Sequence, residues 1–187
     1  MSFAPFQDFI PVAAVPTEIV ERYTGIVEPA VIEMWNTHGY GIAANGFLKV
    51  IDPDRYRTMI GEFLPRPDMI PVLATGMGDL VVAFDDKYRI LQFRYARATG
   101  LGSSVSMIGI KAAQDSWLED MFSVTPYAEA AATYGPLTSP DDLDYIYAYA
   151  LPLPAGGTES VDKLSRARIF EHIAITAHLA GPIPFAG

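Results

Sequence analysis

Apolar residues recur at helical spacing in several short segments of the chain. Val31 and Trp35 share one helix face, and Gly39 follows where a C-terminal cap is expected. Asp52 and Pro53 are the residue types preferred at an N-cap and at the first helical position. This pattern predicts helices over residues 16–23, 28–38, 53–64, 115–122, 126–134 and 166–179.

Other segments have the short apolar runs and turn residues of antiparallel strands. Asn45-Gly46 separates two such runs and is typical of a tight hairpin. Asp85-Asp86-Lys87 joins two further runs, and Thr75 to Asp79 has the composition of a hairpin loop. We expect strands on both sides of Asn45-Gly46 and over residues 70–74, 80–84, 88–95 and 145–150. Residues 105–110 are ambiguous.

The order of these segments is helices, then strands, then helices. This order predicts an α+β fold rather than a doubly wound α/β fold. We expect a mainly antiparallel sheet, roughly from residue 41 to 95 with the 145–150 strand nearby, packed by helices. The segment 97–111 is too short for a separate linker domain, so two small lobes should form one compact body.

The composition restricts the class of protein. Of 187 residues, 50% are hydrophobic, which favours a folded core over disorder. No apolar run reaches the roughly 18 residues of a membrane span, and no basic segment precedes the first apolar stretch, so we expect a cytoplasmic protein. The 22 acidic and 13 basic residues give a net charge of −9, which argues against direct nucleic-acid binding and favours a basic partner.

Candidate catalytic chemistry is sparse. The chain has no cysteine, which excludes disulfides, thiolate catalysis and sulfur metal sites. His172 and His178 are six residues apart and lie on different helix faces, and His38 lies at a predicted helix end. The Gly100-Leu101-Gly102 segment lacks the third glycine of a dinucleotide fingerprint. We therefore expect no enzymatic activity, no catalytic residue, no metal site and no bound cofactor.

The C-terminal third carries an ordered set of motifs. They are Tyr134-Gly135-Pro136-Leu137, an acidic turn, an aromatic strand, the segment from Leu151 to Gly157 and a closing helix that reaches Gly181. This order resembles the C-terminal domain of immunity proteins that neutralise type VI secretion DNase toxins. The segment from Leu151 has an additional proline, and His178 stands where a glutamine is usual. By their chemistry the glycines and prolines here stabilise turns, so we expect them to maintain the fold rather than to contact a partner.

The N-terminal half is similar to the GAD-like domain that precedes this immunity domain. The similarity rests on the segment ending in Trp35, on Gly39-Tyr40-Gly41, on residues 45–56 and on the strands around Asp79 and Leu91-Gln92-Phe93. The resemblance implies a GAD-like domain over residues 1–104 and the immunity domain over residues 105–187. It leaves open whether inhibition covers or distorts the toxin's active site.

The function implied by this resemblance is stoichiometric inhibition of a cognate nuclease in the cytoplasm. An alternative is a non-catalytic adaptor or a small-ligand-binding module. Acidic side chains near the C-terminal motifs are candidates for the toxin contact, since no lysine or arginine lies near Asp141, Asp142 and Asp144 in the sequence. A solvated turn is the simpler interpretation of those three acids. The predicted contact residues are Glu119, Asp120, Asp141, Asp142 and Asp144, with Tyr134 and Tyr145 as aromatic anchors.

Overall fold

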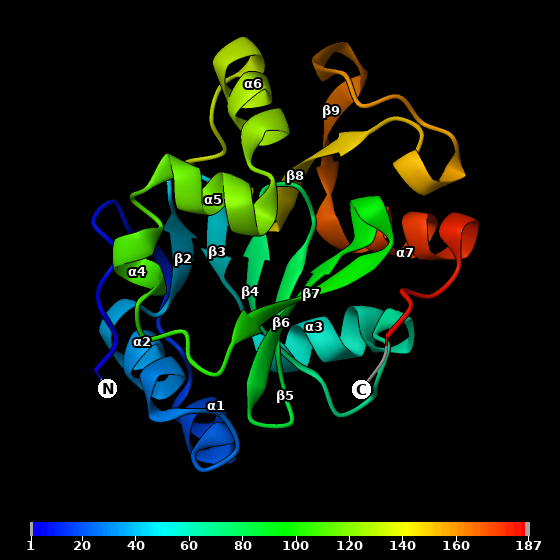
Figure 1. The fold of residues 1–187 in the computed structure, drawn as a ribbon. Coiled ribbons are helices and arrows are strands. Elements are labelled where there is room, and N and C mark those ends of the chain that lie inside the picture. The colour runs from blue at the N-terminus through cyan, green and yellow to red at the C-terminus, as the bar shows by residue number, and fades with distance from the viewer. Residues whose placement is uncertain (1, 186–187) are drawn as a thin grey trace.

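A computed structural model describes residues 2–185 of the chain. It shows an α+β fold with a seven-stranded antiparallel sheet in the order β1-β2-β3-β4-β5-β6-β7 (Figure 1). Each strand pairs with its neighbour in the chain. The strands are β1 (Ile10–Ala13), β2 (Tyr40–Ala43), β3 (Leu48–Val50), β4 (Ile70–Thr75), β5 (Leu80–Phe84), β6 (Lys87–Gln92) and β7 (Arg97–Gly102).

A second sheet pairs β8 (Tyr145–Tyr149) with β9 (Leu164–Arg168). The α-helices are α1 (Thr17–Tyr23), α2 (Pro29–His38), α3 (Pro53–Ile60), α4 (Ile108–Lys111), α5 (Asp115–Phe122), α6 (Thr125–Tyr134) and α7 (Ile169–Ala180). In Figure 1, α6 and the β8–β9 pair stand beyond the end of the large sheet at which β2 turns into β3. Within residues 2–185, no helix is both long and apolar enough to span a bilayer.

The alternation of side chains along the strands divides the core between the two faces of the sheet. Leu80 and Val82 of β5 pack on one face, with Tyr56 of α3 and Ile173 of α7. Val81 of β5 packs on the other face, in a cluster that includes residues of α1, α2, α5 and α6. The sheet is therefore covered by helices on both sides, and both halves of the sequence contribute to each cluster.

Local sequence signals explain several element boundaries. Asp52 caps α3 because its carboxylate accepts hydrogen bonds from the backbone N–H groups of Asp54 (2.9 Å) and Arg55 (3.1 Å). Gly39 ends α2 with φ of +72°, in the left-handed region that favours glycine. Asn45 and Gly46 also have positive φ in the turn between β2 and β3. These predicted features are confirmed.

Other boundaries differ from the sequence prediction. The last helix begins at Ile169 rather than near residue 166, because residues 164–168 form the strand β9, which pairs antiparallel with β8. The 88–95 strand ends at Gln92 and continues as a 3₁₀ turn. The ambiguous 105–110 segment includes the start of α4, and the glycine-containing 97–102 segment is the edge strand β7. The sequence analysis also missed β1, whose pairing with β2 is a long-range contact.

Candidate functional site

Lys49 lies at the contact between the N-terminal sheet and the C-terminal segment. It is on β3, an interior strand of the large sheet, and is fully buried. Its ammonium nitrogen donates hydrogen bonds to the backbone carbonyls of Asp142 and Tyr145. Burial lowers the pKa of Lys49 to about 7, against the opposing attraction of Asp142 and Asp144. Lys49 therefore holds the two parts of the chain together and is unavailable to a partner.

The fold supplies cations to two of the predicted acidic contacts. The Asp142 carboxylate accepts hydrogen bonds from the backbone N–H of Ser139 (2.9 Å) and from Arg166 (2.5 Å). Asp144 forms a two-point ion pair with Arg55 of α3. No cation lies near these acids in the sequence, but tertiary contacts bring both arginines from distant segments. Asp142 and Asp144 thus have a structural role whatever their part in binding.

The remaining predicted contacts lie on separate surfaces. Glu119 is exposed on α5 and accepts hydrogen bonds from the backbone N–H and the hydroxyl of Thr125, at 2.8 and 2.7 Å. Asp120 and Asp141 are exposed, on α5 and on the turn before β8. Their role in binding a toxin stays a prediction.

The two predicted aromatic anchors differ in exposure. Tyr134 ends α6 with 50% of its surface exposed, and its hydroxyl donates to the carbonyl of Val161 at 3.2 Å. The ring of Tyr145 is only half-buried, but the guanidinium carbon of Arg166 lies 3.7 Å from its centroid. This cation–π contact occupies one face of Tyr145. Tyr134 is the more accessible of the two.

A buried ion pair forms a second contact between the two halves of the chain. The side chains of Asp79 and Arg94 are almost completely buried and lie 3.0 Å apart. Arg94 also donates to the backbone carbonyls of Phe122 and Ser123 at the end of α5. Burial raises the pKa of Asp79 to about 6, although Arg94 opposes the shift. The pair caps the C-terminal end of α5 and is explained by packing.

The histidines show no shared site. His38 packs among Phe3, Phe6 and Phe9 and accepts a hydrogen bond from the backbone N–H of Phe6. His172 is buried, and burial lowers its pKa to about 4. Across the described residues 2–185, no group of three or more histidines and carboxylates is arranged to hold a metal ion.

One groove joins the β2–β3 turn to α5 and α6. It has a volume of about 650 Å³ and brings Glu119 together with Asp115. Its apolar lining combines four alanines with larger side chains, namely Ala44, Ala128, Ala131, Ala132, Leu118, Val124, Phe47 and Tyr127. No lysine or arginine is among its lining residues. The groove includes the predicted contact residue Glu119, but its apolar lining was not predicted from the sequence.

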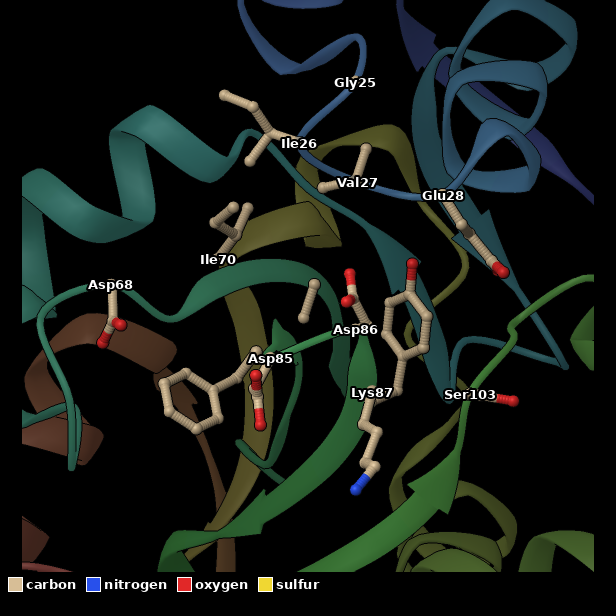
Figure 2. Close-up of a pocket in the computed structure, with 13 residues that line it drawn as sticks. Gly25, Ile26, Val27, Glu28, Asp68, Ile70, Asp85, Asp86, Lys87 and Ser103 are labelled. Carbon is tan, nitrogen blue, oxygen red and sulfur yellow. The ribbon is translucent and has the colours of Figure 1, made fainter. Parts of the chain in front are cut away.

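A second pocket, the hairpin pocket, lies between the α1–α2 connection and the turn from β5 to β6. It has a volume of about 490 Å³. Figure 2 shows its four carboxylates distributed around the apolar side chains of its wall. The carboxylates belong to Glu28, Asp68, Asp85 and Asp86, and the wall includes Ile26, Val27, Ile70 and Phe84.

The charges of the hairpin pocket are unbalanced. Among the described residues, 2–185, Lys87 is the one cation that lines it. Glu28 is held by the backbone N–H of Val105 at 2.6 Å, and Asp68 lies 3.6 Å from Arg66. Within residues 2–185, no cation lies within 4.0 Å of Asp85 or Asp86. Sequence analysis missed this site, although two aspartates in one hairpin turn between apolar strands were a signal for it.

Comparison with known proteins gives a family for part of the chain. Residues 4–92 match the family model of the GAD-like domain, so a GAD-like domain is present in the N-terminal half. All lining residues of the hairpin pocket except Ser103 lie within that range. No curated protein matches the chain.

A solved structure matches nearly the whole chain. The chain is similar to the crystal structure of Atu4351 from Agrobacterium tumefaciens, with a TM-score of 0.71 and 15% sequence identity. The match covers 92% of this chain and 85% of that one. At this identity the likeness shows a shared fold.

Proposed function

We propose that this protein is an immunity protein that binds a cognate type VI secretion DNase toxin in the cytoplasm and neutralises it by stoichiometric inhibition. The observation that carries the proposal is the hairpin pocket, where four carboxylates and one lysine surround an apolar wall. The GAD-like domain and the ordered C-terminal motifs support it. In this proposal the protein has no catalytic role and contacts no DNA itself.

The charge of the protein fits a nuclease as partner. A DNase binds phosphates through lysines, arginines and backbone N–H groups, so its DNA-binding surface is basic. The present chain has a net charge of −9. Opposite charges on two protein surfaces accelerate association and select the partner. An acidic pocket with apolar walls adds buried contact area to that attraction.

Titration of a nuclease encoded beside this gene would test the proposal. Purified nuclease is mixed with increasing amounts of this protein, and cleavage of plasmid DNA is followed at fixed metal concentration. Cleavage should stop near an equimolar ratio, and a pancreatic-type DNase should be unaffected as a control. Full cleavage at a tenfold excess of this protein would refute the proposed function.

A small-ligand-binding module is the second candidate function. The groove that contains Glu119 supports it, because a concave apolar site of about 650 Å³ has the size of a small-molecule pocket. Native mass spectrometry of the purified protein would test this function. A constant mass increment that disappears on denaturation would favour a bound molecule, and the bare chain mass would count against it.

A further inference from the structure

We propose that the hairpin pocket receives a lysine or arginine side chain from the DNA-binding surface of the nuclease, with its charged end at Asp85 and Asp86 and its stem against Ile26. This inference rests on the proposed function and assigns the contact to the GAD-like domain. It names a surface other than the C-terminal acids that the sequence analysis selected.

The shape and chemistry of the pocket suit a lysine or arginine side chain. Ile26 is 60% exposed and contributes an accessible apolar surface to the pocket. Ile70 and Phe84 line the same pocket. Lysine and arginine carry a long apolar stem below a charged end, so one such side chain contacts both the wall and the carboxylates.

The carboxylates of Asp85 and Asp86 are available to a cation from a partner. Asp85 and Asp86 are exposed, and no described residue pairs with either carboxylate. By contrast, Asp142 and Asp144 are already paired with Arg166 and Arg55. A new cation gains more from unpaired carboxylates than from acids whose charge is already compensated.

The second residue of the turn is not the type that the turn geometry favours. Asp85 and Asp86 are the two residues between the paired Phe84 and Lys87, with φ of +50° and +53°. A two-residue hairpin of this kind favours Asn-Gly or Asp-Gly, so Asp85 suits the first position whereas Asp86 stands where glycine is preferred. Adjacent carboxylates also repel each other. Turn preference therefore explains Asp85 but not Asp86, whose charge the proposed contact with a cation would use.

A turn substitution would separate binding from folding. The double variant Asp85→Asn/Asp86→Gly installs the preferred turn and removes both charges. We expect its melting temperature to rise by about 2–4 °C. We expect its Kd for the neighbouring nuclease at low salt to rise at least tenfold, with a weaker dependence of Kd on salt concentration.

A matched control removes the same charge elsewhere. Glu62 and Glu171 are exposed carboxylates outside the pocket, so Glu62→Gln/Glu171→Gln tests the effect of net charge alone. It should raise Kd less than threefold. The single variant Ile26→Ser should also weaken binding, with less change in salt dependence, because it removes the apolar wall.

The outcomes distinguish this inference from the proposed function. If the wild-type protein binds the nuclease and the turn variant binds equally well, or no worse than the glutamine control, the hairpin pocket is not the contact and the inference is wrong. If the wild-type protein does not bind the nuclease at all, the proposed function fails and the inference fails with it. A folded turn variant that has lost inhibition supports both.

Discussion

Replacement of Lys49 by methionine should change how the stability of the protein depends on pH. Lys49 is fully buried on β3, and its pKa of about 7 lies well below the ordinary value of 10.5. In the unfolded chain the same side chain regains the ordinary value. Between these two pH values the unfolded chain therefore binds one more proton than the folded chain, and stability rises with pH.

The size of the effect follows from the two pKa values. A difference of one bound proton changes the free energy of unfolding by about 1.4 kcal/mol per pH unit. Between pH 7.5 and 9, the titration of Lys49 should therefore raise the free energy of unfolding by about 2 kcal/mol, as the cost of burying its charge decreases. The contribution becomes nearly constant only below about pH 6, where Lys49 is protonated in both states. The chain has no cysteine, so thiol ionisation does not overlap this range.

The assay is urea denaturation of both proteins at several pH values from 7.5 to 9. Lys49→Met leaves the carbonyls of Asp142 and Tyr145 without their donor, so stability at a single pH combines several effects. The difference in slope against pH isolates the titration of Lys49. Lys163→Met is the control, because Lys163 is exposed and should leave the slope unchanged. Parallel curves for wild type and Lys49→Met would show that the Lys49 pKa is not lowered.

Other expectations concern the contacts between the two halves of the chain. Arg94→Met leaves Asp79 as an unpaired buried carboxylate. This change should lower the free energy of unfolding by about 3–5 kcal/mol, as measured in urea titrations. A loss below about 1 kcal/mol would contradict the role given to this pair. Gly46→Ala places a Cβ 2.3 Å from the Tyr127 hydroxyl and 2.7 Å from the Leu137 carbonyl, at φ of +91°. It should lower the free energy of unfolding by about 1–3 kcal/mol. The control Gly100→Ala, whose Cβ meets nothing within 4 Å, should leave stability nearly unchanged. Calorimetry of the full chain should show one unfolding transition, because both core clusters contain residues from both halves; two separate transitions would show independent domains.

The candidate sites were predictable only in part. Sequence analysis selected Glu119, which lies in the groove beside α5, and Tyr134, which is exposed. It selected Asp142 and Asp144 because they had no cation nearby in the sequence. Their arginine partners are 24 and 89 residues away, a separation that leaves no local pattern. The Asp85-Asp86 turn was recognised as a turn, but its surplus charge became visible only with the surrounding apolar wall.

The sequence by itself determined the elements that depend on neighbouring residues. Asp52-Pro53 starts α3, Asn45-Gly46 turns β2 into β3, and the apolar runs around residues 80–92 form a hairpin, because capping, turn geometry and side-chain alternation act over a few residues.

Only the tertiary structure decided which side chains meet across long separations. The polar segment 164–168 becomes a strand because β8 offers it a hydrogen-bonding edge. Lys49 is buried because the chain returns 93 residues later to supply carbonyl acceptors. Such contacts depend on how the whole core closes, since a buried polar group is stable only when its partner is brought to it.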